Sequence, residues 1–254
     1  MTSVLWNELP AATLNELAAK DAVVLLPVAS TEQHGPHLAT GVDTVLCWEV
    51  CRRTAELVAA KRPIVVAPTV WMGLAEHHVG FGGTFTLSVA TWHALLRDLC
   101  RSIIRAGFRK ILIVNGHGGN MAALSALTVE LTRELEAPIA TTSYWALPHE
   151  SGAFDAILDD QEGVQHACEA ETSMMMAAAP DLVFTDKLSK AVGPQSSMGS
   201  ALNRPINVWR SFKDLSPSGV LGDARRATAE KGERLLDAAA QAMAERLIAG
   251  EPWN

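Results

Sequence analysis

The chain has 254 residues, 48% of them hydrophobic and 19% charged, which is enough apolar material for a buried core and excludes disordered and fibrous proteins. Its 21 Lys and Arg against 28 Asp and Glu give a formal net charge of −7, which would repel a phosphate backbone, so we expect no nucleic-acid partner. The N-terminal segment has no basic region, and no apolar run approaches the roughly 18 residues that a membrane span needs. We therefore expect a cytoplasmic protein without a membrane partner.

Four short apolar runs flanked by Pro, Gly or Asn are typical of strands that are buried on both faces. They cover residues 22–28, 64–66, 111–114 and 139–142. Between and after them, helical spacing predicts helices over residues 45–58, 92–104, 121–135, 166–179 and 230–247. Asp43 is placed to act as the N-cap of the first of these helices.

Strands that alternate with helices favour an α/β fold with a mainly parallel sheet covered on both faces. No repeat or linker-like tract interrupts the chain, so we expect one domain over residues 1–254. Residues 188–222 are rich in Ser, Pro and Gly without periodicity, which predicts a long loop acting as a lid or a partner-binding surface. The four cysteines, which have no CxxC spacing, are expected to be reduced thiols in the core.

Parallel sheets bind ligands beyond the carboxyl ends of their strands, so function is expected in the segments that follow the apolar runs. Those segments read STEQHGPHLATGVDT, PTVWMGLAEHHVGFGGT and NGHGGN, and all three carry histidines. The chain therefore concentrates titratable side chains where a ligand-binding crevice is expected.

Carboxylates and imidazoles in these segments could hold divalent cations such as Zn²⁺, Mn²⁺ or Fe²⁺. Five groups are too many for one tetrahedral site and suit two metals that share a bridging aspartate. The candidates are Glu32, His34, Asp43, His117 and Glu171. Taken singly, an ExH pair is most often a solvated loop and Asp43 a helix cap, so the argument depends on their joint position at strand ends.

The NGHGGN segment lacks the third glycine of a dinucleotide fingerprint and the GK[ST] ending of a P-loop. A lipase-like oxyanion loop would need a GxSxG elbow, and the chain contains none. What remains is a tight turn that presents His117 and the backbone N–H groups of Gly118 and Gly119 to a ligand. We expect both glycines, together with His78 and Trp145, to contact substrate.

Across residues 25–232 the chain resembles the creatininase (creatinine amidohydrolase) family. The resemblance rests on LPVASTEQHGPHLATGVDT, GLAEHHVGFGGT, ILIVNGHGGN, HACEAETS and GVLGDARRATAEKG, of which the first, third and fourth are specific. It implies a three-layer αβα domain, two divalent metal ions per chain, hydrolysis of a carbon–nitrogen amide-type bond and a homohexamer.

The resemblance also implies roles for individual residues. Glu32 and His117 would hold one metal, His34 the second, and Asp43 would bridge them. Creatininase completes the second site with a Glu two residues after the NGH histidine, where this chain has Gly119, so Glu171 of the ETS motif is the expected replacement. His166 would deliver the proton to the leaving nitrogen after a metal-bridging hydroxide attacks the carbonyl; without the family, a histidine that merely packs on a helix is an equal alternative.

Three departures argue against creatinine as the substrate. Besides Gly119, the family pattern GxSxEH reads GLAEHH here and has lost its Ser and Glu, and an aromatic stacking position is taken by Glu162. We therefore expect a small linear or cyclic amide. The alternatives are a formamide deformylase, a peptidase, or a non-catalytic member that binds a small molecule; a serine esterase that uses the HGG turn ranks last.

Overall fold

A computed structural model describes residues 3–159, 161–195 and 208–254. Within these residues, four strands form one parallel sheet in the order β2-β1-β3-β4. The strands are β1 (Val23–Val28), β2 (Ile64–Val66), β3 (Lys110–Asn115) and β4 (Ile139–Ser143). Each predicted apolar run is therefore a strand, and the predicted bounds agree to within a residue.

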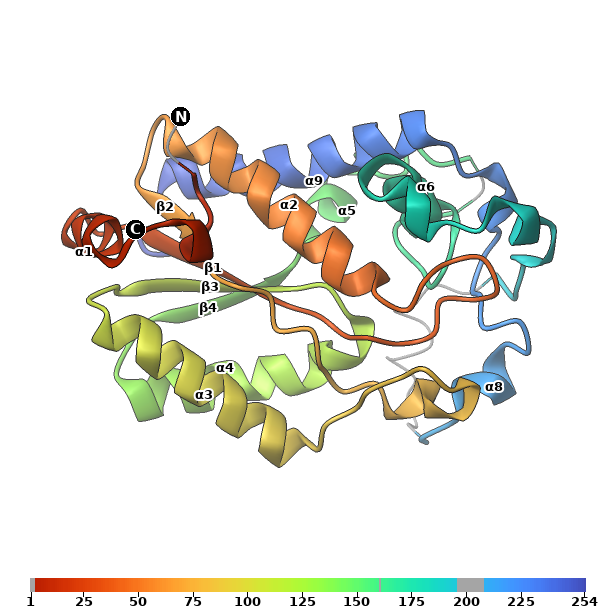
Figure 1. Ribbon diagram of the computed structural model, residues 1–254, viewed down its shortest axis with the longest axis horizontal. Coiled ribbons are helices and arrows are strands. Elements are labelled where there is room, and N and C mark those ends of the chain that lie inside the picture. Colours follow the sequence, from red (N-terminus) through yellow and green to blue (C-terminus); the bar gives the residue numbers. More distant parts are fainter. Residues whose placement is uncertain (1–2, 160, 196–207) are drawn as a thin grey trace.

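Helices cover both faces of this sheet, as the three-layer expectation requires: α2 and α9 lie on one face, and α3 and α4 on the other (Figure 1). The described α-helices are α1 (Ala11–Ala19), α2 (Val42–Ala59), α3 (Val89–Arg105), α4 (Met121–Leu135), α5 (Ala146–Glu150), α6 (Glu169–Ala178), α8 (Phe212–Leu215) and α9 (Ala229–Ala249). Short 3-10 turns join them: η1 (Trp6–Glu8), η2 (Glu76–Phe81), η3 (Gly118–Asn120), η4 (Pro180–Leu182), η5 (Thr185–Lys190) and η6 (Ala224–Arg226).

The sheet is apolar on both faces because alternate residues of each strand enter different core clusters. Val23 and Leu25 of β1 pack with residues of α2, α6 and α9, whereas Val24 and Leu26 pack with residues of α3 and α4. This explains why the strands read as continuous apolar runs. As expected, the four cysteines are buried and free, and Met174 and Met175 belong to the core.

Two helix predictions need correction. Asp43 is not the N-cap of α2, because the helix begins at Val42 with Gly41 as N-cap and places Asp43 inside its first turn. The segment 166–179 is not helical throughout, because α6 begins at Glu169; before it, Ala167 has a φ of 51°, which an α-helix cannot contain. Both deviations place a functional side chain, as described below.

The region 188–222 is only partly a loop. The end of η5 and the short helix α8 lie within it, while residues 196–207 fall outside the described part of the chain. Helices α1 and α5 were not expected from the sequence pattern. No helix of the described residues is long and apolar enough to cross a membrane.

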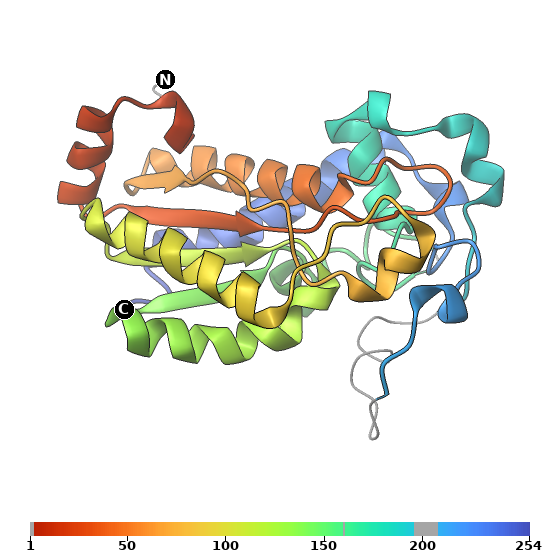
Figure 2. The same cartoon turned by 60° about the horizontal axis from the view of Figure 1, so that its bottom comes forward.

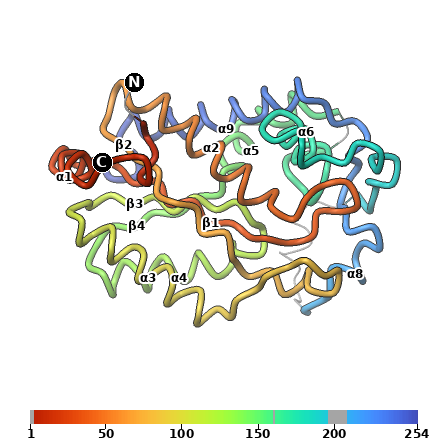
Figure 3. Tube along the Cα trace, in the orientation of Figure 1, coloured from red at the N-terminus to blue at the C-terminus, as the bar shows by residue number. Residues whose placement is uncertain are grey.

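The carboxyl ends of the strands point toward the end of the molecule that holds α6 and α8 (Figure 2). The connection between β1 and α2 extends to this end before it returns, and there it pairs with the segment that follows α6, since Leu38 bridges Val183 (Figure 3). The segments with the predicted site residues therefore converge at one edge of the sheet.

Candidate metal centre

The five predicted metal ligands lie together at the carboxyl edge of the sheet although four different segments supply them. Glu32 and His34 follow β1, Asp43 is in the first turn of α2, His117 follows β3 and Glu171 is in α6. None of the five is more than 5% exposed. Such burial of carboxylates is costly unless positive charge or hydrogen-bond donors compensate it.

Asp43 is the centre of the cluster. Its Oδ1 lies 3.1 Å from Nε2 of His34, and its Oδ2 lies 3.1 Å from Nδ1 of His117. The start of α2 can approach the end of β3 because Gly116 has no side chain: a Cβ there would lie 2.9 Å from the Asp43 carbonyl oxygen and 2.6 Å from Cys47 Cβ. Gly116, the first glycine of NGHGGN, thus permits the contact between Asp43 and His117.

Both histidines are held by a backbone carbonyl through the ring nitrogen that faces away from the cluster. Nδ1 of His34 donates to the carbonyl oxygen of Glu32 at 3.1 Å, and Nε2 of His117 donates to that of Leu74 at 3.3 Å. The other nitrogen of each ring therefore has a lone pair aimed at the carboxylates when the ring is neutral. This arrangement, with the distal N–H on a carbonyl, is typical of metal-binding histidines.

The donor atoms form three overlapping sets that could each hold a cation: Glu32–Asp43–His117, His34–Asp43–Glu171 and Glu32–His34–His166. Asp43 belongs to the first two. Within the cluster, both carboxylate oxygens of Glu32, Oδ2 of Asp43 and Nε2 of His34 are buried without a hydrogen-bond partner. Buried polar atoms without partners are rare and need an explanation. Two divalent cations would satisfy them, so the donor set fits a dinuclear site.

The same charges perturb the acid–base behaviour of the cluster. Burial lowers the pKa of His34, but the carboxylates of Asp43, Glu171 and Glu32 together outweigh burial and raise that pKa to about 9. Burial raises the pKa of Asp43, yet the close rings of His34 and His117 hold that pKa below its usual range. Without metal, protonated imidazoles thus supply the positive charge that the carboxylates require.

Glu171 completes the second set through an unusual backbone conformation. Ala167, in the left-handed region, directs its N–H to Oε2 of Glu171, and this oxygen lies 3.8 Å from Nε2 of His34. Burial raises the pKa of Glu171 to about 8, although His34 opposes this. The carboxylate is thus fixed by the main chain on one side and free to meet a cation on the other.

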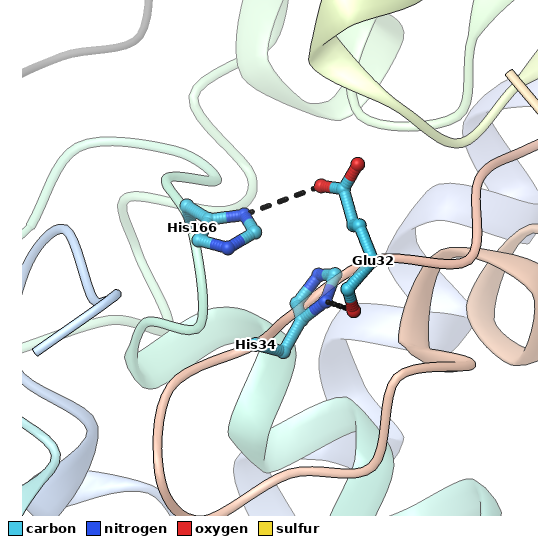
Figure 4. Close-up of side chains that lie close together, drawn as sticks. All are labelled: Glu32, His34 and His166. Atoms are coloured by element: carbon cyan, nitrogen blue, oxygen red, sulfur yellow. Dashed lines mark hydrogen bonds and ion pairs between the residues drawn. The ribbon is translucent and has the colours of Figure 1, made fainter. Parts of the chain in front are cut away.

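His166 lies beside this cluster rather than in either of the two sets that share Asp43. Its Nδ1 is 3.7 Å from Oε1 of Glu32, and its ring packs on that of His34 with centroids 4.3 Å apart (Figure 4). Burial, with the charge of His34, holds the pKa of His166 well below its usual value. A neutral imidazole next to the metal-binding atoms has the position of a general acid/base.

A cavity of about 30 Å³ opens onto the cluster, and the residues predicted to contact substrate all line it: His78, Gly118, Gly119 and Trp145. His77 also lines this cavity. Gly119 must lack a side chain, because a Cβ there would lie 2.4 Å from Nε2 of His117 and 2.7 Å from Cε1 of His77. Glu162, at the position where the family resemblance implies an aromatic residue, is exposed and not part of the lining.

Two residues that the sequence analysis passed over belong to this site. Gln33 is buried between predicted ligands and contacts the rings of His78 and His166. Phe212 of α8 closes the cavity, with its ring centroid 4.3 Å from that of His78 and 4.8 Å from that of His166. Gln33 could have been found as the middle residue of the EQH segment, whereas Phe212 lies in a region without any periodic signal.

His37 has a structural environment despite its place among the histidine-rich segments. Its Nε2 is 2.7 Å from Oγ1 of Thr172 in α6, and burial lowers its pKa to about 4. A neutral imidazole with this partner ties the β1–α2 connection to α6. Nothing in this environment suggests a role in binding a ligand.

The sequence model of the creatininase family, described as creatinine amidohydrolase, matches residues 7–247. A mycofactocin precursor peptide peptidase of Mycolicibacterium smegmatis is 33% identical over 242 residues, covering 94% of this chain and 90% of the relative. A creatinine amidohydrolase of Pseudomonas putida is 30% identical over 260 residues, covering 95% of this chain and 93% of the relative. The similarity therefore extends over nearly the full length of both relatives.

The fold also matches solved creatininases over nearly the whole chain. A crystal structure of creatinine amidohydrolase superposes with a TM-score of 0.84 at 29% identity and covers 99% of both chains. A manganese form of creatininase has a TM-score of 0.83 at 27% identity, covering 98% of this chain and 99% of that one. A mutant Zn–Zn form has a TM-score of 0.81 at 28% identity, covering 99% and 100%.

Proposed function

The chain belongs to the creatininase family, whose members compared above are hydrolases, and from this premise we propose that it is a metal-dependent amidohydrolase. Its reaction is the hydrolysis of a carbon–nitrogen amide-type bond in a small linear or cyclic amide. The observation that carries the proposal is the pair of buried ligand sets, Glu32–Asp43–His117 and His34–Asp43–Glu171, joined at Asp43.

The family supports the identity of the bound group. Solved creatininases include manganese and Zn–Zn forms, and the ligands here are carboxylates and imidazoles, which suit such cations. Two ions per chain would pair with the two sets. When bound, they would supply Lewis-acid polarisation of a carbonyl oxygen and activation of a water.

The chain's own residues would perform the remaining steps. The ring of His166 lies next to Glu32, where Nδ1 can accept a proton from the attacking water and return it to the leaving nitrogen. Gly118 and Gly119 leave room for substrate beside His117, and Trp145 forms part of the opposite wall. Phe212 and the surrounding rings exclude bulk water, which strengthens every electrostatic interaction inside.

A second candidate within the family is cleavage of a peptide bond. It is favoured by the similarity to a mycofactocin precursor peptide peptidase, which at 33% identity exceeds the 30% of the creatinine amidohydrolase. The cavity of about 30 Å³ would have to open for either substrate, and it would have to open further for a peptide than for a small amide. A small amide therefore remains the first choice.

The test combines metal analysis with a substrate screen. Protein purified without chelator and loaded with Zn²⁺, Mn²⁺ or Fe²⁺ is assayed on cyclic ureides, hydantoins, formamides and short peptides. We expect turnover of a small amide that is lost after chelation and restored by the metal. Turnover that resists complete metal removal would contradict the proposal, and binding without turnover across the whole panel would favour a non-catalytic member.

Two histidine variants sharpen this test. His166→Gln should retain two bound metals, because the two sets proposed to hold them, those that contain Asp43, do not include His166, but it should lose most of its turnover. Loss of a metal from this variant would instead assign His166 to the third set, with Glu32 and His34. The control is His93→Gln, in α3, whose ring lies 3.8 Å from the carboxylate of Glu134 and is absent from the cavity lining. This control should keep both metal content and activity.

A further inference from the structure

The side chain of Gln33 lies in the centre of the imidazole cluster without being a metal ligand or a lining residue of the cavity. Its amide nitrogen is 2.9 Å from Nδ1 of His78, 3.0 Å from Nε2 of His166 and 3.2 Å from the carbonyl oxygen of Gly219. Three polar atoms therefore compete for the two hydrogens of one amide group. Which of them accept decides where the protons of both histidines reside.

The orientation of this amide is determined by its other end. Oε1 of Gln33 accepts a hydrogen bond from the backbone N–H of Gly35 at 2.9 Å. A flipped amide would place two donors against each other at that contact, so the nitrogen must face the histidines. Gly219 leaves the space that this amide fills, since a Cβ at Gly219 would lie 2.1 Å from Oε1 of Gln33.

The backbone of Gln33 fixes the tautomer of His166. Nε2 of His166 lies 2.9 Å from the carbonyl oxygen of Gln33. A carbonyl oxygen can only accept, so Nε2 carries the hydrogen and Nδ1 of the neutral ring carries a lone pair. It is this Nδ1 that faces Oε1 of Glu32 at 3.7 Å (Figure 4).

The side chain of Gln33 then fixes the tautomer of His78. Because Nε2 of His166 is already a donor, the two amide hydrogens go to Nδ1 of His78 and to the carbonyl oxygen of Gly219. With Nδ1 as an acceptor, the neutral ring of His78 must carry its hydrogen on Nε2. This nitrogen lies 3.2 Å from Oε1 of Glu32, a predicted metal ligand.

We propose that Gln33 is a positioning residue that sets both tautomers: its carbonyl makes His166 present an unprotonated Nδ1 to the cluster, and its amide makes His78 direct an Nε2–H toward Glu32. The significance of this arrangement for catalysis rests on the proposed function, because it leaves Nδ1 of His166 ready to accept a proton beside Glu32. The tautomers themselves are independent of that function.

The experiment measures the tautomers directly, by long-range ¹H–¹⁵N NMR correlation of the histidine rings in the diamagnetic zinc-loaded protein. Signals are assigned with His78→Gln and His166→Gln variants. In the wild type we expect both rings as the Nε2–H tautomer. An Nδ1–H tautomer of either ring would overturn the proposal.

Two variants of Gln33 separate the backbone from the side chain. Gln33→Glu is nearly isosteric but replaces the donor by an acceptor, so His78 should change to the Nδ1–H tautomer. Gln33→Met removes the donor, and His78 should populate both tautomers. In both variants His166 should keep its Nε2–H tautomer, because the carbonyl of residue 33 remains. An unchanged His78 in both variants would overturn the role of the side chain.

Kinetics and a matched glutamine complete the test. Gln33→Met should lower kcat by about 10-fold with little change in KM and metal content, as is typical when a residue that orients ligands is lost. Gln161→Met is the control, since its buried amide donates to Gly163 and Cys168 and to no histidine. It should lower thermal stability without altering the ring signals of His78. If the panel shows no hydrolysis, the proposed function fails while the NMR result still decides whether Gln33 sets the tautomers.

Discussion

Asp43 is shared by two ligand sets. Substitutions that each remove one carboxylate charge should therefore have unequal effects on the metal content. Of the two sets that contain Asp43, Glu32→Gln disrupts only the one with His117 and Glu171→Gln only the one with His34, whereas Asp43→Asn disrupts both. We expect about two metal equivalents per chain in the wild type, about one in either glutamine variant, and close to none in Asp43→Asn.

Asp43→Asn should also lower the stability of the metal-free protein, by an amount that can be estimated. Asp43 is 3% exposed and lies 3.1 Å from both His34 and His117, so its loss leaves two buried imidazoles without their shared counter-ion. Removal of one partner from a buried ion pair destabilises a protein by about 3–5 kcal/mol. Asp43→Asn should therefore lower the free energy of unfolding of the metal-free form by that order.

The pH dependence follows from the directions of the pKa shifts. The pKa of Asp43 is lowered in the folded protein, so its contribution is present above its unfolded value of about 3.9 and is lost in stronger acid. The pKa of His34 is raised to about 9, so its contribution is complete below its unfolded value and disappears as the pH rises through 9. The difference between wild type and Asp43→Asn should thus be largest near about pH 5–6.

Metal content is measured by elemental mass spectrometry after dialysis against metal-free buffer, and stability by urea unfolding of the chelated protein. Asp237→Asn is a matched control, since its carboxylate is exposed and pairs with Arg53 at the surface. Two retained equivalents in Asp43→Asn, or loss of both in Glu171→Gln, would refute the shared-ligand geometry. Equal stability of chelated wild type and Asp43→Asn near pH 6 would refute the electrostatic reasoning.

Three further outcomes are expected. Gly119→Ala should lose metal, measured by elemental analysis, because its Cβ would lie 2.4 Å from Nε2 of His117, whereas Gly41→Ala, with no atom within 4 Å of its Cβ, should not. Phe212→Ala should speed the release of metal to a coloured chelator several-fold and admit bulkier amides, because this ring closes the cavity; equal release rates would count against it. Gly232→Ala should lower the free energy of unfolding by about 1–3 kcal/mol in urea titrations, because its Cβ would overlap the backbone of α6, although alanine normally favours a helix.

The sheet and most of the metal centre were predictable because both depend on local sequence. Strands buried on both faces must be apolar throughout, and the carboxyl ends of parallel strands meet at one edge. Residues that follow different strands, such as Glu32 and His117, are therefore neighbours whatever the intervening chain does. Glu32, His34 and His117 came together for this reason, whereas Asp43 and Glu171 reach them from the first turns of α2 and α6.

What was missed depends on contacts that no local pattern records. Asp43 was predicted as a metal ligand and also as the N-cap of its helix; only the N-cap role was wrong, because Asp43 lies inside the first turn and faces two histidines. The segment of His166 has helical composition, yet Ala167 takes a positive φ that ends any helix there. Phe212 reaches the cavity from a region whose sequence has no periodicity, so only the fold places it beside His78.

The position of Gly119 links these contacts to specificity. The family resemblance implies a carboxylate at this position in creatininase, but here a side chain would collide with His117 and His77. His77 occupies the adjoining space instead, with its ring stacked 5.6 Å from that of His117, and Glu171 supplies a carboxylate from α6 on the other side of the cluster. Glu171 thereby keeps a carboxylate in the candidate metal site. Beside His117, however, the acidic side chain is replaced by the imidazole of His77. Burial lowers the pKa of His77 to about 3, so this ring is neutral. If the chain hydrolyses an amide as we propose, this wall offers the substrate a neutral imidazole in place of a carboxylate, and we expect it to favour a less basic amide than creatinine.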